Sequence, residues 1–295
     1  MPEEYPNETT RLLFKRGSCR NFEDRPVDPD VLTLVLDAGI HAASGGNLQP
    51  FSIIKILEKE TGARLAELCS NQPFIASAPV NLLFCIDFRR LKRWAALEAA
   101  PFTATSSFRH FWISFQDTII AAQNVCTAAD ANSLGSVYVG SVLECFRELR
   151  EMFELPEGVF PVVLLSLGYP KFEARPRRKL PVNVVVHEGK YREMPDEDLL
   201  AVYNEKYSRA APIEATPDRV ETFGEVCESV GGPEFAARCL ERVQQAGGFN
   251  EVQRYFGLHY RANRMPAGNA GFLQVLKEAG FRCFEEYSRD RSHDK

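Results

Sequence analysis

Three apolar runs of strand length lie in the first 170 residues and determine the architecture that the pattern predicts. Residues 51–57, 80–86 and 160–167 are rich in β-branched and aliphatic side chains at consecutive positions rather than at alternate ones. A strand that is apolar on both sides is covered on both faces. The pattern therefore predicts central strands of a sheet with helices packed on each side.

Helical periodicity fills the segments between these runs. Asn7 is a capping residue for a first helix, and Gly17 is expected to end it as a left-handed stop. Residues 28–30 (Asp-Pro-Asp) open a second helix, whose apolar residues recur at three to four positions and which ends near His41. Residues 115–131 are apolar on more than one side, as expected of a helix buried in a core or in a subunit interface.

Two further elements complete the pattern of the first two hundred residues. Ser141 and Glu144 fit a capping box that opens a helix, which Pro156 and Gly158 end. Residues 182–186 are a valine-rich run that predicts a final strand. Because strands and helices alternate over this length, we expect a sheet with helices on its faces.

The character of the chain changes after about residue 203. Residues 211–217 contain two prolines and look like a linker, and the remainder carries helical periodicity without a convincing strand. We therefore expect a domain at residues 1–204 and a helical C-terminal extension at residues 205–295. The apolar faces of the extension need a burial partner, and packing on the core is favoured over packing on a separate protein.

The amino-acid composition mainly excludes certain classes of protein. The 295 residues are 45% hydrophobic and 25% charged, as in an ordinary globular protein. Because 35 Lys and Arg are interspersed with 40 Asp and Glu, a general polyanion-binding surface is excluded and we expect no nucleic-acid partner. The apolar runs are too short to span a membrane, and the polar start has no secretion signal. We expect a cytoplasmic protein with no membrane partner.

Several familiar sites are missing from the sequence. The eight cysteines are scattered, without a C-x-x-C pair or a nearby histidine pair, so we expect free thiols and no metal site. The patterns G-x-G-x-x-G, H-E-x-x-H and G-x-S-x-G do not occur either. These absences disfavour a Rossmann dinucleotide site, a zinc protease and a serine hydrolase.

Three polar segments together make a site for a phosphorylated, planar ligand. In residues 16–20 two guanidinium groups, a hydroxyl and loop amides can reach a phosphate. Residues 44–50 combine glycines, which allow a close approach of the backbone, with the side-chain amides of Asn47 and Gln49. Residues 177–179 place three cations just outside an apolar strand.

The order of these segments closely resembles the nitroreductase family of flavin mononucleotide (FMN) oxidoreductases. Residues 16–22 fit the opening R-x-S-x-R/K-x-F element, and residues 43–50 fit P-S-x-x-N-x-Q-P, with Ala43 in place of proline. The series continues, in the same order, with Ala78-Pro79-Val80, Asp117, Ala121-Ala122-Gln123-Asn124, Leu134-Gly135-Ser136, Val139-Gly140 and Leu167-Gly168-Tyr169-Pro170. The resemblance covers about residues 10–190.

The fold that this resemblance implies is of the α+β class. It is a three-layer α-β-α sandwich with a mixed, mostly antiparallel sheet, to which the helical C-terminal extension is added. The resemblance also implies a homodimer with flavin sites at the subunit interface. The apolar segment at residues 115–131 is then expected at the two-fold interface.

The resemblance assigns the flavin contacts by position. The phosphate contacts that it implies are Arg16, Gly17, Ser18, Arg20, Arg177 and Lys179. The contacts with the ring and the ribityl chain are Ser44, Gly45, Asn47 and Gln49, which in the family reach across the dimer interface, together with Asn71. The backbone of Val139, Gly140 and Ser141 is expected beside the ring, with one N–H near the reactive nitrogen.

An aromatic-rich segment, residues 101–115, precedes the long apolar helix. In the family this neighbourhood covers the substrate side of the flavin, so the expected pocket residues are Phe102, Phe108, His110, Phe111 and Trp112. The alternative is that these aromatic side chains pack into the core. His110 is the one candidate proton donor, because hydride transfer is chemistry of the flavin and no other catalytic residue is needed.

The resemblance implies an FMN-dependent oxidoreductase. It would pass hydride from NADH or NADPH through the flavin to a nitroaromatic, a quinone or a similar electron-poor small molecule. Two alternatives stay open. One is a specialised reductase, dehalogenase or flavin-fragmenting enzyme on the same fold. The other is a non-catalytic flavin-binding protein whose extension binds a partner.

Overall fold

The fold is that of a computed structural model, which describes residues 5–287. The chain forms two compact units: residues 1–176 together with residues 273–295, and residues 177–272. The division after residue 204 that the sequence predicted, into a flavin-binding part and an extension, stays a prediction. Among residues 5–287 no helix is long and apolar enough to cross a membrane.

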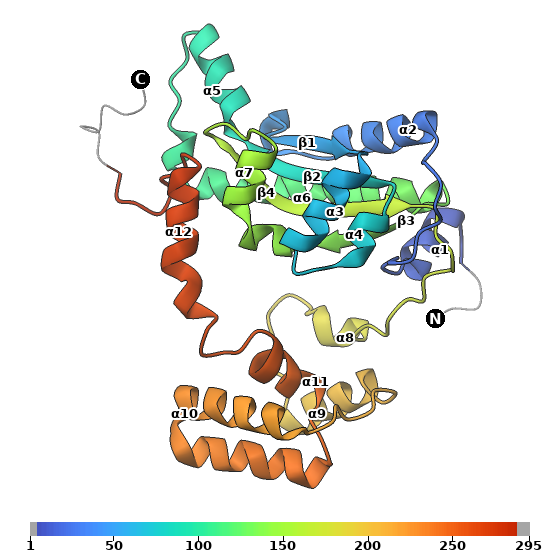
Figure 1. The fold of residues 1–295 in the computed structure, drawn as a ribbon, viewed down its shortest axis with the longest axis vertical. Coiled ribbons are helices and arrows are strands. Elements are labelled where there is room, and N and C mark those ends of the chain that lie inside the picture. The colour runs from blue at the N-terminus through green and yellow to red at the C-terminus, as the bar shows by residue number, and fades with distance from the viewer. Residues whose placement is uncertain (1–4, 288–295) are drawn as a thin grey trace. The chain divides into compact units, whose positions relative to one another are not determined.

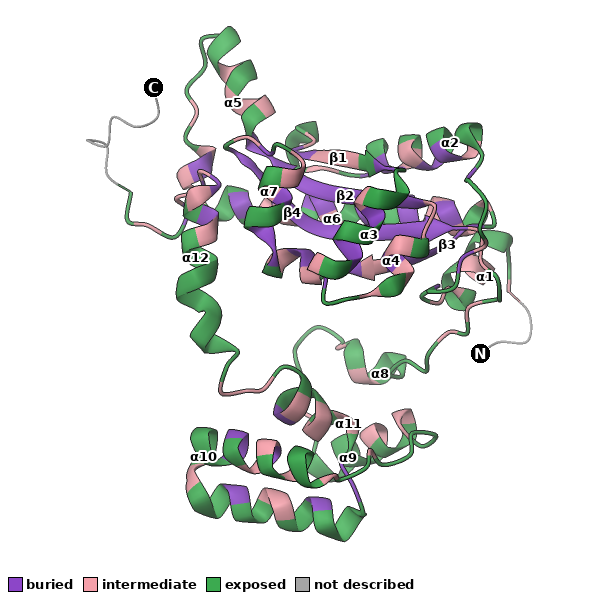
Figure 2. Cartoon of the chain, viewed as in Figure 1, coloured by how far each residue is buried: buried purple, intermediate pink, exposed green. Residues whose placement is uncertain are grey.

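A four-stranded antiparallel sheet forms the centre of the first unit (Figure 1). Its order is β1-β2-β4-β3, with β1 Phe51–Ile56, β2 Val80–Asp87, β3 Gly135–Val139 and β4 Val159–Gly168. Every residue of β2 and β4 is buried, as Figure 2 shows. The three predicted strands are therefore confirmed, but β1 is a partly buried edge strand and not a central one. Strand β3 is an additional strand that the pattern did not predict.

The helices of the first unit follow the chain order of Figure 1. They are α1 (Glu8–Lys15), α2 (Pro29–Ile40), α3 (Lys59–Leu68), α4 (Pro73–Ser77), α5 (Phe88–Leu97), α6 (Phe108–Ala131) and α7 (Phe146–Met152). Short 3-10 turns are η1 (Gly45–Asn47), η2 (Ala104–Ser106) and η3 (Ser141–Glu144). The predicted caps of the first two helices are confirmed, because the Asn7 side chain accepts from Thr10 N and that of Asp28 accepts from Asp30 N.

Helices cover the sheet on both faces. Leu82 and Phe84 alternate along β2 with Leu83 and Cys85, and the two pairs enter different hydrophobic clusters. The first cluster also contains buried residues of α2 and α6, and the second contains buried residues of α3, α4 and α7. The predicted three-layer α-β-α arrangement is confirmed.

The register of the strands defines two ends of the sheet. Phe51 lies opposite Ile86 where β1 begins and β2 passes into α5, and we call this the α5 end. Gly135 lies opposite Gly168 where β3 begins and β4 finishes. We call this the α1 end, because the residues that follow α1 pair with β3 there. Figure 1 shows α1 and α5 at opposite ends of the sheet.

Two predicted helix signals in the first unit differ from the structure. Helix α1 ends at Lys15, just before Gly17 as predicted, but without a left-handed glycine. Gly17 is not among the residues with positive φ; a Cβ on Gly17 would lie 3.1 Å from the carbonyl oxygen of Arg175, so close packing explains the glycine there. The predicted capping box at Ser141 and Glu144 is not formed either. The Ser141 hydroxyl bonds to Gln72 and Cys69 instead, and α7 begins only at Phe146.

The long apolar helix begins earlier than predicted. The hydroxyl of Ser107 accepts a hydrogen bond from His110 N at 3.3 Å, so α6 starts at Phe108 rather than at Phe115. Most of the predicted aromatic segment therefore lies on the first turns of this helix.

The second unit is helical. It contains α8 (Val182–Val185), α9 (Asp196–Lys206), α10 (Pro217–Ala246), α11 (Glu251–Gln253), a π-helical turn η4 (Arg254–His259) and a 3-10 turn η5 (Pro266–Gly268). The predicted strand at residues 182–186 is wrong, because Val182 and Val185 are exposed and form one helical turn after Pro181. Gly232, with a φ of 79°, divides α10 into a hairpin of two helices, visible in Figure 1.

The chain returns to the first unit along α12 (Asn269–Glu278), from residue 273 onward. The ring of Phe281 packs 5.5 Å from that of Phe88 and 5.6 Å from that of Phe111, centroid to centroid. Arg147 forms an ion pair of 2.9 Å with Glu278. Residues 273–287 thus pack on the core of the first unit. Packing of the whole extension, residues 205–295, on the core stays a prediction.

Candidate functional site

The first predicted phosphate segment, residues 16–20, lies at the α1 end of the sheet. Cys19 N donates to Ser136 O at 2.9 Å, and Ser18 forms a parallel bridge with Ser136. Because neighbouring side chains of an extended segment point to opposite sides, Cys19 is buried while Ser18 and Arg20 are exposed. The segment therefore directs a hydroxyl and a guanidinium group to the surface.

Arg16 carries a guanidinium group that lacks an acceptor. Its Nε and Nη2 atoms are buried without a hydrogen-bond partner, and its Cζ atom lies 5.6 Å from the ring centroid of Tyr138. Burial raises the pKa of Asp130 to about 6, and the charge of Arg16 acts against this shift. A buried donor without an acceptor is unfavourable. Phosphate oxygens would supply the missing acceptors, so this residue fits the phosphate of FMN.

The basic segment at residues 177–179 follows shortly after residues 174–175, which contact Gly17 in the first phosphate segment. Ala174 Cβ and Arg175 O each lie 3.1 Å from the position of a Cβ on Gly17. Arg177 and Lys179 follow two and four residues after Arg175, at the start of the second unit.

The residue between these two cations is already engaged inside the second unit. Arg178 forms an ion pair with Glu205, and it donates to the carbonyl of Glu205 at 2.8 Å and to the hydroxyl of Ser208 at 3.2 Å. Arg178 thus stabilises the second unit, and a phosphate contact by Arg177 and Lys179 stays a prediction.

The predicted contacts with the flavin ring, Asn71 and residues 139–141, lie beside the end of β3. Gln72 Nε2 donates to Cys69 O at 2.7 Å and to Ser141 Oγ at 2.9 Å, which ties the turn before α4 to the residues after β3. Asn71, next to Gln72, is exposed with a φ of 53°. Gly140 is exposed too, and a Cβ built there meets no atom within 4 Å. A ligand can therefore approach the backbone after β3, and sequence reasoning missed Gln72.

These contacts continue into the phosphate segment. The guanidinium of Arg20 lies 5.7 Å from the ring centroid of Phe74, on α4, and Phe74 packs against buried Cys19 and Val137. We call the whole group the phosphate half-site: Arg16, Ser18, Arg20, Asn71, Val139, Gly140 and Ser141. Val139 itself is buried, so its backbone rather than its side chain is available to a ligand.

The other predicted flavin segment forms a tight loop at the α5 end. Gly46, Asn47 and Gln49 have φ values of 60°, 56° and 49°, a left-handed conformation that glycine and asparagine tolerate best. Ser44 Oγ accepts from Gln49 N at 3.0 Å, and Gln49 Nε2 donates to Ile40 O at 2.8 Å. The Gln49 side chain thus stabilises the loop, while Asn47 is exposed.

Two charged side chains hold this loop from opposite directions. Asp117 on α6 is only 5% exposed and accepts from Gly45 N at 2.9 Å. Burial raises the pKa of Asp117, and the hydrogen bond from Gly45 opposes the shift. Arg90 on α5 donates to the carbonyls of Gln49 and Phe51 at 2.5 and 2.7 Å. Sequence reasoning did not assign a role to either side chain.

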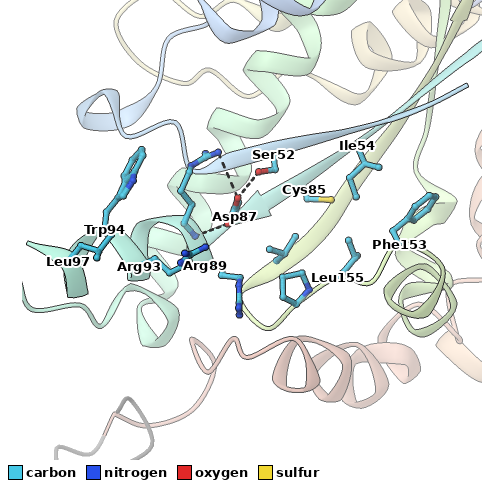
Figure 3. Close-up of a pocket in the computed structure, with 13 residues that line it drawn as sticks. Ser52, Ile54, Cys85, Asp87, Arg89, Arg93, Trp94, Leu97, Phe153 and Leu155 are labelled. Carbon is cyan, nitrogen blue, oxygen red and sulfur yellow. Dashed lines mark hydrogen bonds and ion pairs between the residues drawn. The ribbon is translucent and has the colours of Figure 1, made fainter.

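Asp87 in turn orients Arg90. Its carboxylate accepts from Ser52 Oγ at 2.5 Å and from Arg90 N at 3.0 Å, and Figure 3 shows this network in a cavity of about 550 Å³. Arg89 and Arg93 line the same cavity and carry exposed side chains. The base of α5 therefore carries a cluster of arginines on this side.

A larger cavity, of about 830 Å³, opens beside the loop. Its walls come from the loop, from α5, from residues 100–104 and from α6, and include Gly45, Gly46, Leu91, Trp94, Glu98, Phe102, Ser107, His110, Ile113, Ser114 and Asp117. The walls are mostly apolar with a few convergent polar groups, which is typical of a small-molecule site. We call it the loop cavity.

The predicted aromatic pocket residues are divided between this cavity and the core. Phe102 and His110 line the loop cavity, and His110 Nδ1 lies 2.9 Å from Ser107 Oγ. Phe111 is buried against Phe281 and Phe284. Phe108 and Trp112 are half-exposed, and their ring centroids are 6.0 Å apart.

The loop and the phosphate segment at residues 16–20 lie at opposite ends of the same sheet. The backbone N–H of Cys19 donates to the carbonyl of Ser136, beside the Gly135–Gly168 pair at the α1 end. The loop instead enters β1 at Phe51, opposite Ile86 at the α5 end. One chain therefore does not bring the two predicted flavin segments together. Within residues 5–287 no cluster of three or more His, Cys, Asp and Glu side chains is arranged to hold a metal ion.

Several known proteins are similar to this chain in sequence and in fold. The sequence model of the nitroreductase family matches residues 13–169. The NADPH-flavin oxidoreductase of Vibrio harveyi is 31% identical over 193 residues, 65% of this chain and 78% of the relative. The oxygen-insensitive NADPH nitroreductase of Salmonella typhimurium is 30% identical over 217 residues, 74% and 88% of the two chains. The solved structure of NfrA2 from B. megaterium has a TM-score of 0.70 at 27% identity, covering 94% of this chain and 98% of its own.

These relatives confirm the enzyme class that the motifs predicted, an FMN-dependent NAD(P)H oxidoreductase. The family match extends from α1 to the end of β4, and so includes both the phosphate half-site and the loop. The chain belongs to the nitroreductase family.

Proposed function

We propose that the protein reduces electron-poor small molecules, such as nitroaromatics or quinones, with NADH or NADPH as the electron donor and FMN as the cofactor. The observation that carries the proposal is that two guanidinium nitrogens of Arg16, Nε and Nη2, are buried without a hydrogen-bond acceptor in the phosphate half-site. Ser18 and Arg20 add a hydroxyl and a second cation to it, as a phosphate monoester requires. Arg177 and Lys179 complete the phosphate site in this proposal.

The chain's own residues bind and orient the cofactor. Bound FMN supplies the hydride chemistry of the reaction. The exposed backbone at Gly140 offers a place for the ring, which the backbone N–H groups of residues 139–141 and the side-chain amide of Asn71 would hold by hydrogen bonds. Because His110 Nδ1 is bonded to Ser107, its Nε2 nitrogen is left to hydrogen bond with the acceptor or to donate a proton to it.

The proposal includes a homodimer. Within one chain the Ser44–Gln49 loop and residues 16–20 lie at opposite ends of the sheet, so a second copy has to bring its loop and its loop cavity to the flavin of the first. A two-fold axis then makes two equivalent sites.

The remaining predictions become part of the same proposal. All the predicted site residues fall within residues 1–204, which we retain as the flavin-binding part, with residues 205–295 as an addition to it. A cytoplasmic location is supported by the eight cysteines, none of which is in a disulfide.

Purified protein tests this function directly. We expect a yellow protein that releases FMN on heating and oxidises NADH or NADPH faster when a nitroaromatic acceptor is present. Absence of flavin, together with failure to bind added FMN, would refute the proposal. Fast reduction of the flavin with no turnover of generic acceptors would indicate a specialised reductase, and no reduction by either nucleotide would indicate a non-catalytic flavin protein.

Complementation tests the shared site. A chain with Arg16→Met and a chain with Asn47→Ala and Gly46→Val each lack one half of the site. Mixed dimers of the two should regain one active site per dimer. No recovery in isolated mixed dimers, or an active flavin-loaded monomer in sedimentation, would contradict the dimer.

A further inference from the structure

The charged groups of the loop cavity are mainly acidic. Asp117 and Glu98 line it, and of the lining residues, all of which lie in the described part of the chain, none is Lys or Arg. His110 is the one basic side chain among them. An anionic ligand would therefore enter this cavity without a fixed positive charge to pair with.

Asp117 places its carboxylate where solvent screens it little. The residue is 5% exposed, and its bond from Gly45 N stabilises the ionised form. Charges in a buried, low-dielectric site interact more strongly than charges in water. The effect on a ligand in the cavity is repulsion of an anion and attraction of a cation.

The arginines of α5 do not offset this charge in the loop cavity. Arg89, Arg90 and Arg93 line the neighbouring cavity of about 550 Å³ instead. The Arg90 guanidinium is occupied by the carbonyls of Gln49 and Phe51, and it lies 3.8 Å from the carboxylate of Asp87. Helix α5 directs Trp94 and Leu91, not its arginines, to the loop cavity.

We propose that Asp117, assisted by Glu98, makes the enzyme select neutral or cationic aromatic acceptors and reject anionic ones. This inference rests on the proposed function, because it concerns the acceptor of that same site. The aromatic and aliphatic walls accept a flat apolar ring, and the carboxylates then discriminate by the charge of the ring's substituents.

A matched trio of acceptors isolates charge from shape: 4-nitrobenzoate, 4-nitrobenzamide and 4-nitrobenzylamine. For the FMN-loaded enzyme at low salt, we expect kcat/KM for the amide to exceed that for the benzoate by about tenfold or more, and the benzylamine to be accepted at least as well as the amide. Chromate, a small dianion, should be a poor acceptor. Raising the salt concentration should narrow the difference between benzoate and amide.

The variant Asp117→Asn removes the charge but keeps an oxygen to accept the Gly45 hydrogen bond. It should lower the amide-to-benzoate ratio several-fold, chiefly through a lower KM for benzoate. Glu98→Gln, at an exposed position, should shift the ratio in the same direction by less. Glu60→Gln on α3, which changes net charge equally at an exposed site outside the cavity, should leave the ratio unchanged.

Two outcomes would overturn the inference. One is equal kcat/KM for benzoate and amide in the unmodified enzyme. The other is an amide-to-benzoate ratio that Asp117→Asn does not change in a folded, flavin-loaded protein; if that variant fails to fold, an unchanged ratio in Glu98→Gln together with no salt dependence decides in the same way. An enzyme that reduces none of the three compounds, and whose flavin NADPH does not reduce, would instead refute the proposed function.

Discussion

The guanidinium of Arg90 donates a hydrogen bond of 2.5 Å to the backbone carbonyl of Gln49, 41 residues earlier in the chain. Gln49 has a left-handed φ of 49°, which a non-glycine residue adopts only when its surroundings hold it there. The same guanidinium bonds to the carbonyl of Phe51, where β1 begins. Helix α5 thus fixes the end of the loop that leads into the sheet, while Asp117 of α6 fixes its beginning at Gly45.

Replacing Arg90 with Met should destabilise the protein. The carbonyls of Gln49 and Phe51 lose their donor, and the expected loss in the free energy of unfolding is about 1–3 kcal/mol. Urea denaturation measures it. Arg93→Met is the matched control, because that exposed side chain should contribute within about 0.5 kcal/mol. An equal effect of the two substitutions would mean that Arg90 does not hold the loop.

Arg16→Met should weaken FMN binding without lowering the stability of the apoprotein. The substitution removes a buried guanidinium whose Nε and Nη2 lack partners, so the apoprotein should be as stable as before or more stable. Affinity for FMN should fall by about 1.5–3 kcal/mol, through loss of a charge-assisted phosphate contact. Fluorescence titration of the apoprotein with FMN and with riboflavin checks this, since riboflavin lacks the phosphate and should lose little affinity. Loss of stability with unchanged FMN binding would show a structural role only.

The sequence predicted those parts of the fold that a local pattern specifies. Residues 80–86 and 160–167 are apolar at consecutive positions because β2 and β4 lie in the centre of the sheet between two helical layers, and residues 51–57 show the same pattern more weakly in the edge strand β1. Strand β3 was not predicted because it is short and begins with Gly135 and Ser136, which have low β propensity. At residues 182–186 the same β-branched signal was misleading, because those valines have no strand to pair with and remain mostly exposed.

The site was predictable only as a set of segments. Motif spacing indicated Arg16, Ser18 and Arg20, but not that the guanidinium of Arg16 lacks a partner. The contact between Gly45 and Asp117 spans 72 residues, and no local pattern encodes it. The sequence also does not show that Phe111 packs in the core, whereas His110, one residue earlier, lines the loop cavity.

Gly140→Ala should impair flavin binding without affecting stability. A Cβ at this exposed position meets no atom within 4 Å, so the free energy of unfolding of the apoprotein should change by less than about 0.5 kcal/mol. If the flavin ring lies against this backbone, the added methyl group should weaken FMN binding or slow reduction of the flavin by NADPH. Gly168→Ala is the opposite control: its Cβ would lie 2.4 Å from Pro79 Cδ, so it should destabilise the protein. Unchanged FMN affinity and reduction rate in Gly140→Ala would place the ring elsewhere.

The buried carboxyl of Asp130 should make stability fall as the pH rises from about 4 to above 6. Burial raises its pKa to about 6 in the folded protein, against an ordinary value near 3.8. Because the folded state holds the proton more tightly than the unfolded state, this group favours folding below pH 4, and that contribution is lost as the pH passes 6. Asp130→Asn should therefore match the unmodified protein at pH 4 and exceed it in stability at pH 7.5. Denaturation at the two pH values tests this, and a stability difference that does not grow with pH would contradict it.

The last prediction concerns the C-terminal residues that pack on the first unit. Phe281 is 2% exposed, and its ring contacts those of Phe88, Phe111 and Phe160. Phe281→Ala should lower the free energy of unfolding by about 3–5 kcal/mol, because the core cannot collapse fully around the cavity left behind. Phe284→Ala is the control at 48% exposure and should have a much smaller effect. Thermal and urea denaturation compare the two variants. If Phe281→Ala is no more destabilising than Phe284→Ala, residues 273–287 are not part of the cooperative core, and removing them should leave the first unit folded.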